Sequence, residues 1–163
     1  WGVFFVILVT LLFLRQVRPA IIIALAIPFS LITSFIFLYL FGYTINLISL
    51  MSLAIASGMV VDNGVVVLEN IFRHLERGSS PIQAAINGAS EMGMAITASS
   101  MTTVVVFVPL MFLTGLAGII FKQLGFVIVI TILASLFTAL TMTPMLCSRW
   151  VKKGVLEGKN QKK

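Results

Sequence analysis

The residues of this sequence best suited to chemistry are three polar side chains within a long apolar run: Asp62, Asn63 and Glu69. A carboxylate deep in a bilayer costs about 2.5 to 3.5 kcal/mol on insertion scales, and such residues mark functional sites in membrane proteins. Removal from water disfavours the charged form of a carboxylate, so Asp62 is expected to take up and release a proton. Asp62 is therefore the predicted proton carrier of this chain.

A purely structural role is the alternative for Asp62, whose carboxylate would then pair permanently with a cation or hydrogen-bond to a neighbouring helix. No Lys or Arg of this sequence lies at the same depth of the apolar run. A paired cation would therefore have to come from another helix or another chain. The two roles differ in one property, because only a proton carrier has to titrate.

Asn63 and Glu69 are weaker candidates for a proton relay. Glu69 follows Asp62 by seven residues, which returns it to nearly the same helix face about 10 Å away, where it would line an exit route for protons. Its alternative role is that of an interfacial carboxylate whose head reaches water. Asn63 is suited either to orienting water beside Asp62 or to hydrogen-bonding a neighbouring helix.

The chain lacks the residue sets that membrane enzymes need, so we expect no catalytic residues, no metal site and no cofactor. It has one cysteine, Cys147, and one histidine, His74, which are too few for the usual zinc centres. Asp62 is the only deep carboxylate, whereas an aspartyl protease needs two. The HExxH and GxSxG motifs are absent. The expected coupling ion is the proton.

The composition indicates a membrane protein. Of the 163 residues, 60% are apolar and 10% are charged, whereas soluble domains average about half apolar and a quarter charged. The net charge of +6 would suggest nucleic acid in a soluble protein, but here the basic residues lie between apolar runs, where they set topology. We therefore expect an all-α, polytopic membrane helix bundle whose surroundings are lipid and not nucleic acid.

Charges and glycine-containing turns divide the sequence into five apolar runs, and a spanning helix needs about 20 mainly apolar residues. The bundle is expected over residues 1–150, with spans at about 1–14, 19–41, 45–71, 91–113 and 119–147. Ser80 followed by Pro81 is typical of a helix start and predicts a short interfacial helix over residues 80–90. Residues 151–163 contain five lysines and are expected to form a truncated cytoplasmic linker.

The basic residues also predict the orientation. With five alternating spans, ten of the eleven Lys and Arg residues fall on one side, and Lys122 alone falls on the other. The positive-inside rule then places the N-terminus on the periplasmic side and the C-terminus in the cytoplasm. The odd number of spans and the short first span suggest that roughly one half is present of a transporter built from two related halves.

Several spaced motifs resemble one transporter family. The sequence GMVVDNGVVVLENI at residues 58–71 closely resembles the fourth-helix signature of resistance-nodulation-division (RND) transporters of the hydrophobe/amphiphile efflux branch. Shorter blocks in the same order are also similar to that branch: Arg18-Pro19, Ala26-Ile27-Pro28, residues 42–46, Phe107-Val108-Pro109 with Gly115 and Gly118, and residues 143–147. The chain is thus identified as a fragment of the N-terminal transmembrane half of an RND pump.

The resemblance implies that the five spans correspond to helices two to six of a twelve-span pump, which couples inward proton flow to drug export. By this carry-over Asp62 matches the first of two adjacent relay aspartates, and Asn63 replaces the second. The relay lysine and its hydroxyl partner belong to the second half of the transporter. The family further implies the bacterial inner membrane, a homotrimer, a periplasmic adaptor and an outer-membrane channel.

Three other interpretations remain open from the sequence. The chain could belong to an RND-superfamily transporter that moves lipid or protein instead of drugs. It could also be a non-transporting module that resembles sterol-sensing domains and has no need for Asp62 to titrate. The third interpretation is a truncated gene product without activity.

Overall fold

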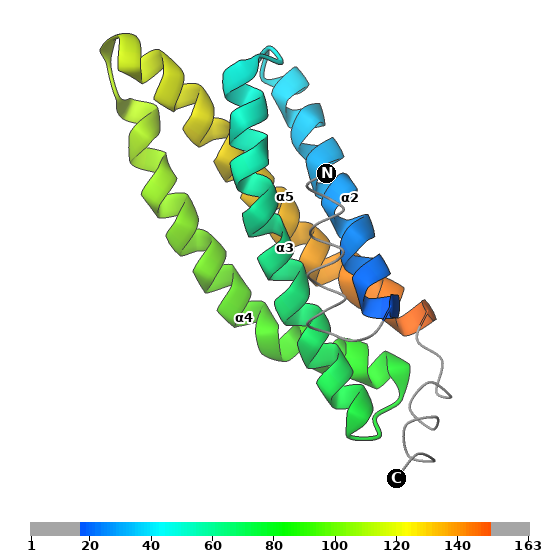
Figure 1. Ribbon diagram of the computed structural model, residues 1–163. Coiled ribbons are helices and arrows are strands. Elements are labelled where there is room, and N and C mark those ends of the chain that lie inside the picture. The colour runs from blue at the N-terminus through cyan, green and yellow to red at the C-terminus, as the bar shows by residue number, and fades with distance from the viewer. Residues whose placement is uncertain (1–16, 151–163) are drawn as a thin grey trace.

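The computed structural model describes residues 17–150, and this part of the chain consists of helices without a strand. The elements in chain order are α2 (Val17–Leu40), α3 (Leu47–Glu76), α4 (Pro81–Phe107), the short 3₁₀ helix η1 (Val108–Phe112) and α5 (Gly115–Trp150). Consecutive long helices run in opposite directions, so the α2–α3 and α4–α5 connections lie at one end of the bundle and the α3–α4 turn lies at the other (Figure 1).

Four helical segments within residues 17–150 are long and apolar enough to cross a membrane: Ile21–Leu40, Leu47–Glu76, Pro81–Phe112 and Gly115–Arg149. They correspond to the predicted spans at 19–41, 45–71, 91–113 and 119–147, so the all-α membrane class is confirmed. The count of five spans is not confirmed, because the remaining predicted span, residues 1–14, lies outside the described residues. The predicted linker, residues 151–163, lies outside them as well.

The connection between α2 and α3 shows why the chain turns where it does. Gly42 has a φ of 71°, a left-handed conformation that glycine adopts without steric cost. Asn46 then caps α3, because its side chain accepts a hydrogen bond from the Ser49 backbone N–H at 2.9 Å. The same side chain donates to Gln123 Oε1 at 3.1 Å, which fixes the start of α3 against α5.

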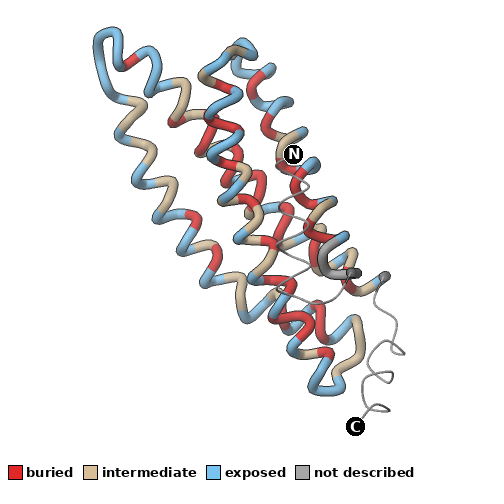
Figure 2. Tube along the Cα trace, in the orientation of Figure 1, coloured by how far each residue is buried: buried red, intermediate tan, exposed pale blue. Residues whose placement is uncertain are grey.

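The longest helix, α5, packs against each of α2, α3 and α4 and carries much of the buried surface. Buried apolar residues of α5 such as Ile128, Ile132 and Ala139 face the neighbouring helices, and Figure 2 shows the buried positions gathered where helices meet. The outer faces are also apolar, since Phe29 is 48% exposed and Leu116 is 86% exposed. Apolar groups on both faces are typical of helices surrounded by lipid.

The predicted division of residues 80–113 into an interfacial helix and a separate span is wrong as secondary structure. Ser80 does cap the helix, with Pro81 as its first residue, but α4 then continues without a break to Phe107. No proline follows until Pro109, which lies in the 3₁₀ turn that ends the helix. The first turns of α4 pack against α3 through a buried face that consists of Ala84, Ala85 and Gly88. The polar residues between them lie on the exposed face of the same helix.

The contact between Gly88 and Ile71 is the reason that this face of α4 carries small residues. A Cβ atom built on Gly88 would lie 2.8 Å from the Ile71 backbone N and Cα atoms, which is closer than real Cβ contacts. Helix α3 also extends to Glu76, five residues past its predicted end at residue 71. The longer helix places additional polar residues against α4.

Candidate functional site

Asp62 lies near the midpoint of α3, several turns from either end of the helix. Its side chain is exposed in this chain, and among residues 17–150 it has no hydrogen-bond or ion-pair partner. The carboxylate is therefore not buried among the described helices. In a membrane the remaining surface around Asp62 would be lipid or another helix, and an unpaired charge there is unfavourable.

A small polar cavity of about 90 Å³ adjoins Asp62. It is large enough to hold water, because one water needs only roughly 10 to 15 Å³ of such space and two or more polar partners. The cavity is lined by Met59, Asp62 and Asn63 of α3, by Ser99, Ser100 and Thr103 of α4, and by Ile132 of α5. The hydroxyl groups of α4 thus face the predicted proton carrier across a space suited to water.

Asn63 has a different environment from its neighbour Asp62. Its Nδ2 group donates to Ser100 Oγ at 3.2 Å and to Ser135 Oγ at 3.4 Å, and Ser135 Oγ donates to the Val60 carbonyl at 3.2 Å. Asn63 therefore connects α3 to both α4 and α5. Of the two functions considered for Asn63, hydrogen bonding to neighbouring helices is the one that these contacts place in the structure.

Glu69 is exposed on α3 and is not among the residues that line the Asp62 cavity. The structure therefore does not bring Glu69 and Asp62 together, and the predicted exit route through Glu69 stays a prediction. A larger apolar groove of about 490 Å³ lies between α2 and α5, with Phe37, Phe126 and Phe137 in its lining. It holds no group that could bind a proton, because its only polar lining side chain is Thr33.

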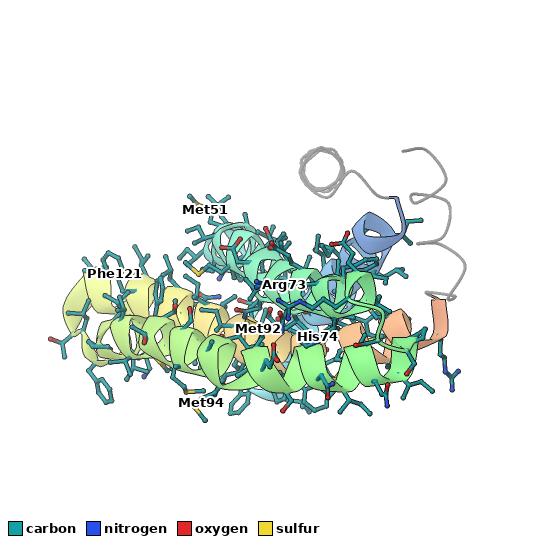
Figure 3. The ribbon with its side chains drawn as sticks, turned by 90° about the horizontal axis from the view of Figure 1, so that it is seen from below. Met51, Arg73, His74, Met92, Met94 and Phe121 are labelled. Carbon is teal, nitrogen blue, oxygen red and sulfur yellow. The ribbon has the colours of Figure 1, made fainter. Side chains whose placement is uncertain are left out.

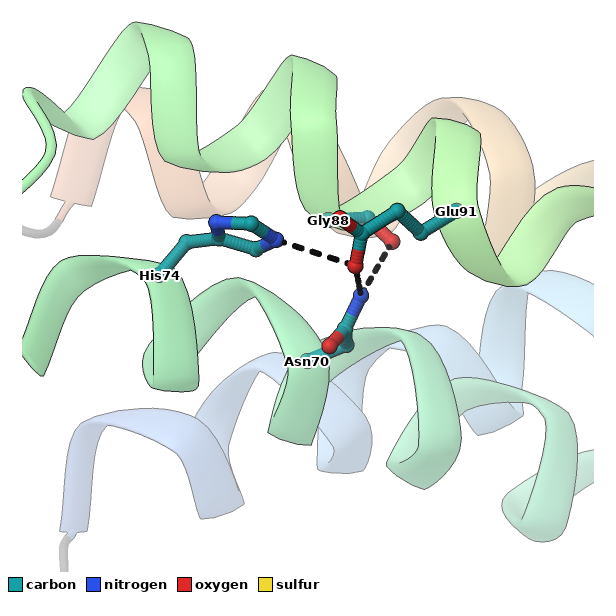
Figure 4. A network of polar contacts seen from close by, with 4 residues as sticks. All are labelled: Asn70, His74, Gly88 and Glu91. Carbon is teal, nitrogen blue, oxygen red and sulfur yellow. Dashed lines mark hydrogen bonds and ion pairs between the residues drawn. The ribbon is translucent and has the colours of Figure 1, made fainter. Parts of the chain in front are cut away.

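A second polar cluster, which the sequence did not predict, joins α3 to α4 (Figure 4). Asn70 Nδ2 donates to the Gly88 carbonyl at 3.1 Å and to Glu91 Oε2 at 3.0 Å. His74 Nε2 contacts the same Glu91 oxygen at 3.1 Å. In Figure 3 His74 and Met92 lie where α3 and α4 meet, whereas Met94 points away from the bundle.

Glu91 and His74 are the two titratable residues of this cluster. Glu91 follows the predicted interfacial helix over residues 80–90 in the sequence, but in the structure it lies within the continuous helix α4. The side chain of His74, the one histidine of the sequence, is only 13% exposed and contacts Glu91. The sequence signal that favours this cluster is the i, i+4 spacing of Asn70 and His74, which places both on one helix face.

The family model described as the AcrB/AcrD/AcrF family matches residues 1–162. The chain belongs to this family. The AcrB/AcrD/AcrF assignment confirms the resemblance to RND efflux transporters on which the sequence analysis relied.

Relatives named Multidrug resistance protein MdtC are similar over most of the chain. The protein from Pectobacterium carotovorum subsp. carotovorum (strain PC1) is 47% identical over 147 residues, which cover 90% of this chain and 14% of the relative. The protein from Escherichia coli O139:H28 (strain E24377A / ETEC) is 47% identical over 148 residues, covering 91% of this chain and 14% of the relative. The chain therefore spans about one seventh of the length of the relatives that it matches.

Proposed function

We propose that this member of the AcrB/AcrD/AcrF family is the membrane part of a proton-driven efflux transporter that exports hydrophobic or amphiphilic compounds, with Asp62 as the proton carrier. The observation that carries the proposal is the Asp62 carboxylate, which has no partner among residues 17–150 and lies beside a polar cavity near the middle of a membrane-long helix. The name of the relatives, Multidrug resistance protein MdtC, supports drug export over other cargoes.

The proposed cycle depends on the charge of Asp62. The deprotonated carboxylate attracts a cation from the other half of the transporter, and protonation from the periplasmic side removes this attraction, so the helix packing shifts. Release of the proton to the cytoplasm resets the site. Each inward proton supplies about 2.3 kcal/mol per 100 mV of membrane potential, in addition to its pH gradient.

The location and partners follow from the same proposal. The transporter would lie in the bacterial inner membrane, with the N-terminal side of this chain periplasmic and its C-terminal side cytoplasmic. It would complete its relay with a second transmembrane half and work as a homotrimer with a periplasmic adaptor and an outer-membrane channel. Asn63 leaves one titrating carboxylate at this relay position, because an amide does not titrate in the working range of pH.

The test is proton-dependent export by the full-length parent transporter in proteoliposomes, with Asp62→Asn compared with Asp62→Glu. We expect Asp62→Asn to reduce export of an amphiphilic dye to background and to abolish proton counterflow. Asp62→Glu, which keeps the carboxylate, retains part of both. An Asp62→Asn transporter that still exports dye in proportion to the proton gradient contradicts the proposal. Export of lipid but no dye would favour the lipid-transport alternative, and no transport of any kind would favour the sterol-sensing-like module.

A further inference from the structure

The Asn70–His74–Glu91 cluster brings two titratable groups, the His74 imidazole and the Glu91 carboxylate, into direct contact. Glu91 Oε2 lies 3.1 Å from His74 Nε2 and also accepts the Asn70 amide. Glu91 is 54% exposed, whereas His74 is 13% exposed and Asn70 is 7% exposed. The carboxylate therefore reaches solvent while its two partners face the helix contact.

The chemistry of the cluster exceeds what a simple helix clamp requires. A glutamine in place of Glu91 would accept the same two hydrogen bonds without any charge. A carboxylate next to an imidazole forms a pair that takes up and releases protons together, and imidazole is the side chain that changes charge most readily near neutral pH. Within residues 17–150 the groups that act on Glu91 are Asn70, His74 and Arg77, all from the α3 side.

The cluster lies on the same helix–helix contact as the Asp62 cavity. Asn63 and Asn70 are seven residues apart on α3, so they share a helix face with a rise of about 10 Å between them. Both contact α4, Asn63 through Ser100 and Asn70 through Glu91. Between these two polar positions the contact contains the buried apolar residues Val67 and Ile96, which are 0% and 4% exposed and belong to one cluster.

This arrangement has a polar cavity near the midpoint of α3, an apolar layer, and a partly exposed titratable pair in which His74 lies two residues from the end of α3 that leads into the α3–α4 turn. Figure 1 shows this turn at one end of the bundle. Apolar constrictions gate transport by excluding water, and they conduct when they become wet. That end is the predicted cytoplasmic one, because Arg73 and Arg77 lie there.

We propose that Glu91 and His74 form a second proton-binding site, which accepts protons that leave Asp62 when water enters the Val67–Ile96 layer and passes them to the cytoplasm. This inference rests on the proposed function of Asp62. The step forms an O–H bond at Glu91 or an N–H bond at His74 and breaks the O–H bond of protonated Asp62 through intervening water. The proton then moves from the pair to bulk water, and no electrons are transferred.

The experiment measures export by the full-length parent transporter in proteoliposomes, with the pH varied separately on the cytoplasmic and periplasmic sides. Glu91→Gln keeps the acceptor oxygen for Asn70 and His74 but removes the carboxylate with which His74 forms the proton-binding pair. We expect its export to fall about tenfold and to lose its dependence on cytoplasmic pH, with the dependence on periplasmic pH unchanged. Glu91→Asp, which restores a carboxylate, should recover part of the cytoplasmic dependence.

The outcomes separate this inference from the proposal for Asp62. If Glu91→Gln exports with an unaltered dependence on cytoplasmic pH, the cluster only clamps α3 to α4 and the inference is overturned. In that case an inactive Asp62→Asn variant would still support Asp62 as the proton carrier. Proton-dependent export by Asp62→Asn would instead remove the proposed function. Should Glu91→Gln fail to assemble, His74→Gln removes the other titratable partner, and an unaltered cytoplasmic profile in that variant overturns the inference equally.

Discussion

Asp62 and Asn63 are adjacent on α3 but have different environments. Asp62 is exposed and unpaired within residues 17–150, whereas Asn63 donates to serines on two other helices. Successive helical residues point about 100° apart, so holding Asn63 toward α4 and α5 also fixes the direction of Asp62. Asn63 therefore contributes to the site by positioning its neighbour.

Replacement of Asn63 by alanine should destabilise the helix packing, because Ser100 and Ser135 lose their common partner. Interhelical hydrogen bonds in membrane proteins contribute about 0.6 to 2 kcal/mol, and we expect Asn63→Ala to cost about 1 kcal/mol. Thermal unfolding of the detergent-solubilised full-length transporter measures this loss. The matched control is Asn87→Ala on the exposed face of α4, which should change stability by less than about 0.5 kcal/mol. Equal effects of the two substitutions would contradict the assignment.

At the scale of helices, α4 contacts α3 both at the Asn70–His74–Glu91 cluster and near its middle, where Asn63 reaches Ser100. Asn70 and His74 reach Glu91, Ile71 packs on Gly88, and Asn63 bonds Ser100. These contacts are spread over roughly 15 Å of α3. Together these contacts hold α3 against α4 along this length.

Gly88→Ala tests the close approach of the two helices. The added Cβ atom would meet backbone atoms of Ile71 at 2.8 Å, and backbone cannot move aside as a side-chain end can. We expect a loss of about 1 to 3 kcal/mol, as for overpacked cores, measured by the same thermal unfolding. Gly64→Ala is the control, because nothing lies within 4 Å of its Cβ position and alanine favours a helix by roughly 0.5 to 1 kcal/mol. A Gly88→Ala protein as stable as the parent would show that the helices can separate without cost.

The start of α3 offers a test of capping. Asn46→Ala removes the side-chain acceptor of the Ser49 N–H and the contact to Gln123, and loss of such a cap costs about 1 kcal/mol. Asn46→Ser keeps a capping oxygen but is too short to reach Gln123, so it isolates the cap from the interhelical contact. We expect the loss of stability in the serine variant to be less than half of the loss in the alanine variant. Identical melting temperatures for the two variants would place the whole effect in the Gln123 contact.

For the whole molecule, the helix order predicts which turns share a side of the membrane. The α3–α4 turn should be cytoplasmic, and the α2–α3 and α4–α5 connections should be periplasmic (Figure 1). Ser79→Cys and Thr114→Cys report this in a full-length transporter whose cysteines outside these 163 residues are replaced, because Cys147 is the one cysteine of this sequence and is buried. A membrane-impermeant thiol reagent added to spheroplasts should label position 114 and leave position 79 unlabelled. The reverse pattern would invert the proposed orientation.

The sequence predicted the features that depend on local composition. The apolar runs predicted α2, α3 and α5, and the Ser80–Pro81 pair predicted the start of α4. The polar residues within the apolar run of α3 singled out Asp62 as a candidate. It did not predict that α4 is continuous, because residues 82–91 include the polar side chains Gln83, Asn87, Ser90 and Glu91, which lower the hydropathy of the first turns of the helix. The Glu91 cluster was missed for a similar reason, since its partners Asn70 and His74 lie on another helix, and spacing along one helix does not specify a contact between two.

The contact between Gly88 and Ile71 also has a mechanical consequence. Since the helices are already in backbone contact there, we expect any tilt of α3 against α4 to pivot at this contact. Asp62 lies nine residues from Ile71, about 13 Å along the helix, so a tilt of about 10° displaces it by roughly 2 Å. The hydrogen bonds between Asn63 and Ser100 would limit this displacement. Gly88, which is not among the residues that line the cavity beside Asp62, would thus influence how wide that cavity can become.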